Sequence, residues 1–165
     1  MDIFSHALWG TTIIRKRPFV WWAFLFGAAP DILGTGPGIL YTLFKQKQFL
    51  PPNFWQLMPQ FAKENYHFWH SILGILVVFL LLFFIKRGVY ILTIPYIFHV
   101  FIDILTHQTD IFSRLFYPLV KYSEARSFGL NWWENSWLIW LSLILIIVIN
   151  SIIFIINKKR AVVQR

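Results

Sequence analysis

The chain has 165 residues, and we expect one domain over residues 1–165. Apolar residues make up 58% of it and charged residues 13%, where soluble domains carry about 45–50% and about 25%. These proportions exclude an intrinsically disordered chain and make the lipid bilayer the expected solvent. The absence of cysteine excludes a disulfide scaffold and restricts metal ligands to histidine nitrogen and carboxylate oxygen.

The net charge of +8 arises from 15 Lys and Arg against 7 Asp and Glu. In a soluble protein this excess would suggest nucleic acid as the partner. No basic stripe along a helix face accompanies it, so we expect no nucleic-acid partner. We attribute the charge to the positive-inside rule and to contact with anionic membrane lipids.

In chain order, the first predicted element is a short helix over residues 2–14, with Asp2 or Ser5 as its N-cap. Four apolar segments suited to a bilayer follow, over about residues 18–33, 68–85, 89–106 and 137–156. Gly88 permits a tight turn between the second and the third of these segments.

The two remaining segments, 34–66 and 107–136, are rich in aromatic residues, and they also contain proline and glycine. We interpret them as two structured loops at the membrane interface. The predicted fold class is therefore all-α. It is an integral membrane helical bundle of about four to five membrane-embedded helices.

Three segments, 15–17, 86–87 and 158–165, contain Lys and Arg but no acidic residue. The positive-inside rule predicts that these segments are cytoplasmic, which places the N-terminus outside and the C-terminus inside. The stretch 15–29 also has the pattern of a signal peptide, but cleavage after it would remove His6, so we favour its retention.

Ionisable residues within apolar segments usually mark a functional site. His99, Asp103 and His107 follow one another at intervals of four residues and so share one face of a helix. His67 and His70, three residues apart, share a face of the preceding apolar segment. A rise of about 1.5 Å per residue from the basic segments places both groups near the outer interface.

Asp31 reaches the same layer by this count, and His6 lies in the first helix. Neutral imidazoles and carboxylates gathered at one depth favour a divalent metal site, with zinc expected and manganese as the alternative. Seven ligands exceed what one tetrahedral ion needs, so we expect one or two ions. The candidate ligands are His6, Asp31, His67, His70, His99, Asp103 and His107.

Each of these residues alone also has a structural interpretation. His70 and Ser71 could form a capping and packing pair, and His99 could pair with Asp103 between helices. Asp31 could end a helix, because glycines follow it closely. The shared depth of all the groups favours a common site over these separate explanations.

Four motifs occur in order, with two shorter ones after them: Asp2–Gly10, Ala29–Ile32, His67–Ser71, His99–His107, Phe116–Pro118 and Trp132–Glu134. Together they resemble a family of bacterial inner-membrane metal-dependent hydrolases over nearly the whole chain. That family is similar in turn to bacterial zinc-dependent phospholipase C, an all-helical enzyme.

The resemblance implies metal ligands at His6, Asp31, His67 or His70, His99, Asp103 and His107. It also implies Asp31 as the bridging ligand or general base. The later His-x-x-x-Glu ligand pair of the enzyme has no counterpart in this sequence, so a third metal is not expected.

We therefore expect a phospholipase C-like hydrolase of the inner membrane that cleaves an ester or phosphoester of a lipid or lipid-linked substrate by metal-activated water. Asp31 and Asp103 are the candidate catalytic carboxylates, and Arg114 and Tyr117 are candidate substrate contacts. Two alternatives remain open: a divalent-metal transporter or sensor, and a structural membrane subunit with a non-catalytic His/Asp cluster.

Overall fold

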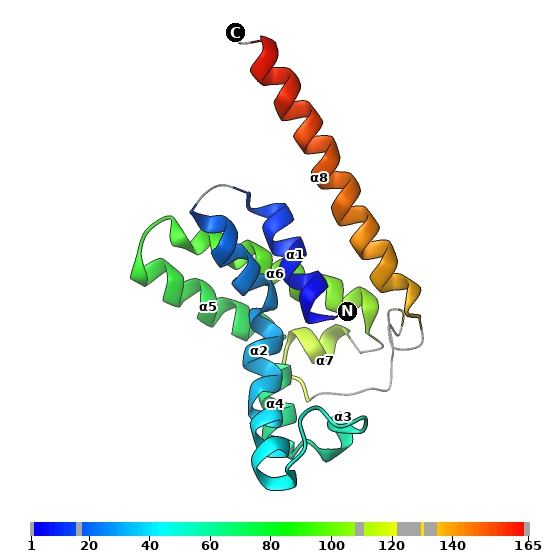
Figure 1. Cartoon of the computed structure of the whole chain (residues 1–165). Helices are drawn as coiled ribbons and strands as arrows, with labels where there is room; N and C mark the ends of the chain where they lie inside the picture. Colours follow the sequence, from blue (N-terminus) through cyan, green and yellow to red (C-terminus); the bar gives the residue numbers. More distant parts are fainter. Residues whose placement is uncertain (1, 16–17, 108–110, 122–129, 131–134, 164–165) are drawn as a thin grey trace.

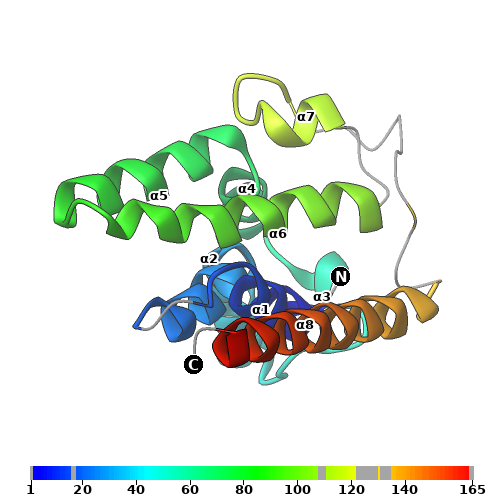
Figure 2. The same cartoon turned by 90° about the horizontal axis from the view of Figure 1, so that it is seen from above.

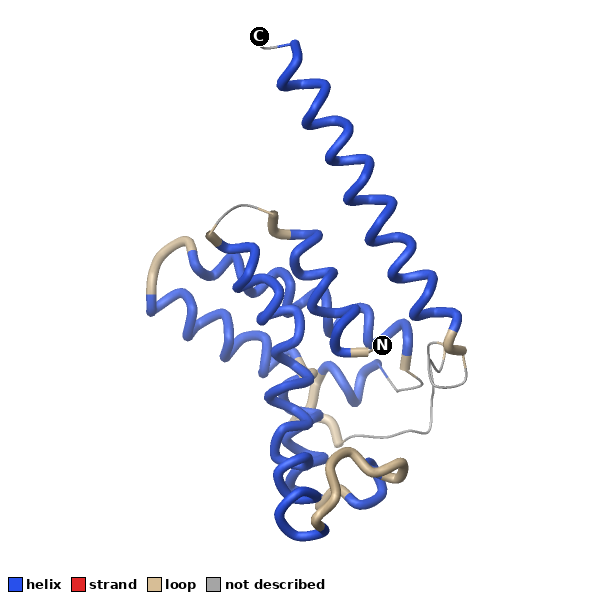
Figure 3. The backbone as a smooth tube through the Cα atoms, in the orientation of Figure 1, coloured by secondary structure: helices blue, strands red, loops and turns tan. Residues whose placement is uncertain are grey.

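The computed structural model describes residues 2–15, 18–107, 111–121, 130 and 135–163. Every regular element within these ranges is a helix, which confirms the all-α fold class for the described part of the chain (Figures 1 and 3). The elements are α1 (Ile3–Ile13), α2 (Phe19–Gln46), α3 (Phe54–Leu57), α4 (Gln60–Trp69), α5 (Ile72–Ile85), the 3-10 helix η1 (Val89–Leu92), α6 (Thr93–Thr106), α7 (Ile111–Leu115) and α8 (Trp137–Val163).

The first helix begins and packs as its sequence requires. Asp2 is the N-cap of α1, and its carboxylate accepts hydrogen bonds from the backbone N–H of Ser5 at 2.9 Å and from its hydroxyl at 2.6 Å. Gly10 allows α1 to pack closely on α2, because a Cβ atom there would lie 2.1 Å from the carbonyl oxygen of Ala23. This close packing carries His6 into the interior.

The second helix is longer than predicted, because it continues through Pro37 to Gln46. A proline has no N–H, so the carbonyl of Leu33 lacks its usual partner within the helix. The side chain of Asn65 in α4 supplies one: its Nδ2 donates to Leu33 O at 2.6 Å and to Gly34 O at 3.0 Å. A contact from a distant helix thus stabilises a stretch whose composition predicts a loop.

The prediction of a structured loop over residues 34–66 is therefore wrong for most of that segment. It contains the last part of α2, the whole of α3 and most of α4. The predicted loop over 107–136 contains the short helix α7. Residues 108–110, 122–129 and 131–134 of that loop lie outside the described residues.

The structure divides the predicted span over 68–85 into two helices. α4 ends at Trp69, α5 begins at Ile72, and the axes of the two helices differ by 64°. The Ser71 hydroxyl oxygen accepts a hydrogen bond from Gly74 N–H at 3.2 Å, so Ser71 is the N-cap of α5. At about 1.5 Å per residue, α5 alone is too short to cross the hydrocarbon core.

Three helical segments of the described chain are long and apolar enough to cross a membrane: α2, η1 with α6, and α8. The bent pair of α4 and α5 would add a fourth. The expected segment over 89–106 is confirmed, and Gly88, with a φ of +95°, forms the turn before it. The N-terminal start of the last predicted span, at Trp137, is also confirmed.

The last helix, α8, runs alongside α1 and leaves most of its apolar surface exposed (Figures 1 and 2). Two hydrogen bonds join the pair: Trp9 Nε1 donates to the Ser142 hydroxyl at 2.8 Å, and Asn150 Nδ2 donates to the Thr12 hydroxyl at 3.0 Å. The small apolar core lies elsewhere, around Tyr96 of α6.

Candidate metal centre

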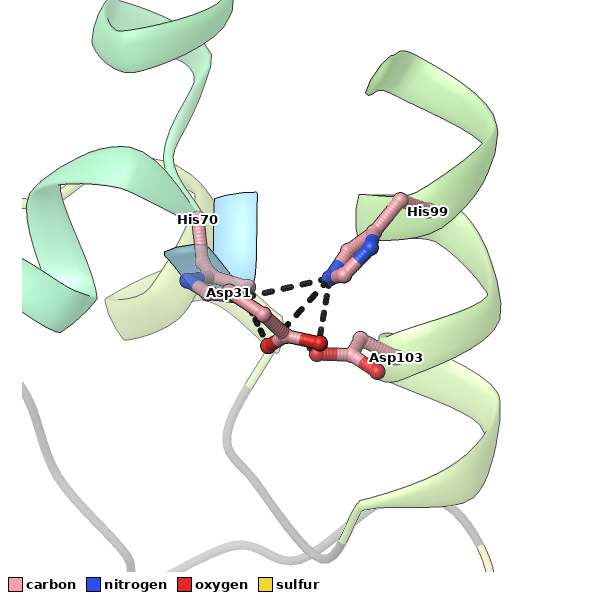
Figure 4. Close-up of side chains that lie close together, drawn as sticks. All are labelled: Asp31, His70, His99 and Asp103. Atoms are coloured by element: carbon pink, nitrogen blue, oxygen red, sulfur yellow. Dashed lines mark hydrogen bonds and ion pairs between the residues drawn. The ribbon is translucent and has the colours of Figure 1, made fainter. Parts of the chain in front are cut away.

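Four side chains from separate parts of the sequence point toward one another in the interior (Figure 4). Asp31 comes from α2, His70 from the break between α4 and α5, and His99 and Asp103 from successive turns of α6. One potential ligand atom from each lies within 4.8 Å of those of the other three. The bend at His70 is what directs this imidazole toward α6.

The spacing of the ligand atoms fits one small cation. The two Nε2 atoms of His70 and His99 are 3.3 Å apart. They lie 3.5 and 3.6 Å from Asp31 Oδ1, and 3.4 and 3.6 Å from Asp103 Oδ2. Zinc bonds of about 2.0–2.2 Å in tetrahedral geometry separate neighbouring ligands by about 3.3–3.6 Å. All five of these separations therefore match one tetrahedral ion.

Backbone carbonyls fix the orientation of both imidazoles. His70 Nδ1 lies 2.8 Å from Tyr66 O, and His99 Nδ1 lies 2.7 Å from Gly27 O. A carbonyl oxygen only accepts hydrogen bonds, so each Nδ1 is the donor, and each neutral ring presents the lone pair of Nε2 to the cluster. Two facing lone pairs beside two carboxylates require a cation or an additional proton. Metal-ligating histidines characteristically donate their second ring nitrogen in this way.

The cluster is nearly closed to its surroundings. His70, His99 and Asp103 are buried, whereas the side chain of Asp31 keeps 16% of its surface exposed. A small ligand such as water would therefore reach the cluster beside Asp31.

Asp103 is the centre of a wider polar network. Its Oδ1 lies 2.8 Å from His6 Nε2 and 3.3 Å from His107 Nδ1, and its Oδ2 accepts a hydrogen bond from Arg114 Nη2 at 2.7 Å. The ring of His6 stacks on that of His99 with a centroid separation of 3.7 Å. Six of the seven predicted ligands thus come together around the two carboxylates.

His6 and His107 flank Asp103 from outside the four-residue cluster, and both imidazoles are neutral near pH 7. Burial, with a smaller effect of the neighbouring His99, lowers the pKa of His6 to about 4, although Asp103 opposes the shift. Burial also lowers the pKa of His107 to about 3, again against the effect of Asp103. A neutral imidazole is the form that binds metal.

Arg114 is buried and faces the cluster from α7. Besides its ion pair with Asp103, its Nη2 donates to the hydroxyl of Tyr66 at 3.2 Å. The sequence singled out Arg114 as a substrate contact and missed its pairing with Asp103. It also missed Tyr66, whose ring lies 4.0 Å from that of His70, because Tyr66 falls in a segment predicted to be a loop.

The structure places His67 and Tyr117 outside the four-residue cluster. His67 is buried, with ring centroids 5.9 Å from Trp55 and 5.7 Å from Tyr117. Partial burial raises the pKa of the Tyr117 phenol, and the charge of Glu64 adds to that effect. Of the two histidines that the resemblance left as alternatives, His70 is the one in the cluster.

The chain was also compared with known proteins. No family model, no curated protein and no solved structure matched it. The resemblance to membrane-bound metal-dependent hydrolases therefore stays a prediction, and the metal centre rests on its own geometry.

Proposed function

We propose that this protein is a membrane-embedded metal-dependent hydrolase centred on Asp31, His70, His99 and Asp103. The observation that supports it best is the pair of oriented imidazoles whose Nε2 atoms lie at tetrahedral spacing from two carboxylates. Zinc is the expected ion, with manganese as the alternative. A second ion would take Asp103 Oδ1 with the flanking imidazoles.

A divalent ion held there supplies Lewis acidity and lowers the pKa of water toward about 7. Asp31, the most accessible member of the set, orients that water and accepts its proton. Arg114 holds Asp103 in place and directs positive charge at the site, which favours a substrate that gains negative charge during reaction.

The proposed substrate is the ester or phosphoester of a lipid or lipid-linked molecule. Two of the ligand-bearing segments, α2 and α6, belong to helices of membrane-spanning length, so a substrate would enter from the bilayer. The distribution of Lys and Arg favours a multi-pass protein of the bacterial inner membrane, with the site near the extracytoplasmic face and the C-terminus in the cytoplasm.

A structural role is the main alternative, and the burial of His70, His99 and Asp103 favours it. An ion that is closed off by four protein ligands only holds helices together. Catalysis needs access for water, and the exposure of Asp31 is the feature that separates the two roles.

Metal content is the first test of this proposal. We expect about one to two equivalents of zinc or manganese in the detergent-purified protein by elemental mass spectrometry. Asp103→Asn and His70→Ala should lose the metal, because each removes a ligand atom. Glu64→Gln is the matched control, since Glu64 is an exposed carboxylate that pairs with Gln60. Hydrolysis of phospholipid and phosphodiester substrates should follow metal content, stop on chelation and return with zinc.

Two results would contradict parts of the proposal. If neither the folded wild type nor the folded variants contain metal, even after zinc is added back, the proposal of a metal centre is contradicted. The wild type could bind metal that both variants lose, while no ester tested is hydrolysed. That result would favour the structural role over the hydrolase. In that case the variants should show a lower melting temperature than Glu64→Gln.

A further inference from the structure

A second polar feature lies away from the metal centre, where α8 passes the end of α1. A cleft of about 620 Å³ opens there, and its polar lining comes from Arg15, Asn150, Ser151 and Asn157. Lys and Arg are common around it in the sequence: Lys16 and Arg17 follow Arg15, and a basic cluster follows Asn157. Among the described residues that line the cleft there is no carboxylate, so the charge of this lining is positive.

Part of the Arg15 guanidinium has no acceptor among the described residues. Its Nε donates to the carbonyl of Thr12 at 2.8 Å, which fixes the side chain against the end of α1. Its Nη2 is buried and has no hydrogen-bond partner within the described part of the chain. A buried cationic donor without an acceptor is costly, and the oxygen of an anion would satisfy it.

The rest of the lining identifies the kind of anion. Ile153, Phe154 and Ile155 form an apolar wall that continues into the exposed apolar surface of α8. One turn further along the helix, Lys158 and Lys159 are exposed. A guanidinium beside this apolar wall suits an amphiphile with a phosphate headgroup and acyl chains. A free inorganic ion would leave the apolar wall without a partner.

We propose that this cleft binds the headgroup of an anionic phospholipid, with Arg15 as the principal contact to its phosphate. The apolar wall would lie against the first part of an acyl chain. This inference goes beyond hydrolysis, because no residue of the cleft belongs to the metal centre. It requires the protein to be in a membrane but does not depend on catalysis.

The test is lipid titration of the detergent-purified protein by native mass spectrometry. The wild type should bind one phosphatidylglycerol more tightly than phosphatidylcholine. Arg15→Gln should weaken phosphatidylglycerol binding about tenfold or more, as expected for the loss of a charge-assisted hydrogen bond. Arg87→Gln removes an equal charge from an exposed turn and should weaken phosphatidylglycerol binding at most about fivefold. Ser151→Trp leaves the charge unchanged but places a bulky side chain in the cleft, so it should also weaken binding.

Several outcomes would overturn the proposal. If Arg15→Gln and Arg87→Gln weaken phosphatidylglycerol binding equally, the lipid is attracted to the basic surface in general and not to the cleft. Displacement of phosphatidylglycerol by millimolar inorganic phosphate would identify a site for the free ion. Should Arg15→Gln fail to fold, undiminished binding by Ser151→Trp would reject the cleft. Unchanged metal content in folded variants would separate these results from any failure of the hydrolase proposal.

Discussion

Asp103 and Asp31 have different surroundings although both carboxylates face the same two imidazoles. Asp103 also pairs with Arg114, whereas the described ion-pair partners of Asp31 are imidazoles alone. Buried carboxylates are stable only with opposite charge or several hydrogen bonds. Asp31 is therefore the residue whose charge most requires an added cation, and its exposed edge is where water would approach.

Asn65 shows how one side chain can stabilise the interior of a distant helix. We expect Asn65→Leu to lower the free energy of unfolding by about 1–3 kcal/mol, because the Leu33 and Gly34 carbonyls lose their donor. Thermal unfolding in detergent, followed by circular dichroism, measures the change. Gln60→Leu, which removes an exposed amide from the same helix, is the control and should change stability little. Equal melting temperatures for the two variants would contradict this role of Asn65.

At the scale of elements, α1 and α2 approach each other closely where small residues lie between them. Gly10 faces the backbone of α2, while Gly27 provides the carbonyl that orients His99. Close approach of the two helices therefore affects the candidate metal centre, since α1 also carries His6.

Gly10→Ala should separate these helices and destabilise the fold by about 1–3 kcal/mol. Its Cβ atom would lie 2.1 Å from Ala23 O, which is backbone and cannot rotate away. Gly36→Ala in α2 is the matched control, because a Cβ there meets nothing within 4 Å. This control should be neutral or stabilising by up to about 1 kcal/mol. The melting temperatures of the two variants test this prediction. A melting temperature of Gly10→Ala equal to that of the wild type would show that α1 does not pack on α2 as described.

For the whole molecule, the basic segments provide the main evidence on orientation. The start of α2, the α5–η1 turn and the C-terminal part of α8 lie in the upper part of Figure 1, and the α2–α3 connection lies at the bottom. This shared end agrees with the pattern of Lys and Arg. Which membrane face it occupies stays a prediction.

Cysteine labelling can test this orientation, because the natural chain contains no cysteine. A membrane-impermeant maleimide added to intact spheroplasts should label Gln48→Cys, in the α2–α3 connection. It should label Arg87→Cys, at the opposite end, only after the membrane is permeabilised. The reverse pattern would place the metal centre nearer the cytoplasm, and labelling of both variants in intact spheroplasts would argue against membrane embedding.

The sequence predicted most of the helices and most of the residues that gather at the candidate site. It did not predict where the helices end or which of two neighbouring histidines reaches the site. The spacing of His99, Asp103 and His107 indicated one shared face, and both histidines do contact Asp103. The spacing of His67 and His70 could not show which one reaches the site. That choice depends on the 64° bend between α4 and α5, which a uniformly apolar segment does not reveal.

The sequence by itself determined what its composition and periodicity control: helices, apolar spans, and histidines and carboxylates at a common depth. These properties follow from a fixed rise per residue and from the cost of placing polar groups in lipid. Only the tertiary structure decided that α2 continues past Pro37, that His70 joins the cluster, and that Arg114 pairs with Asp103. Each of these depends on a contact between residues far apart in the chain, where a neighbouring helix supplies the hydrogen bond or charge that local sequence lacks.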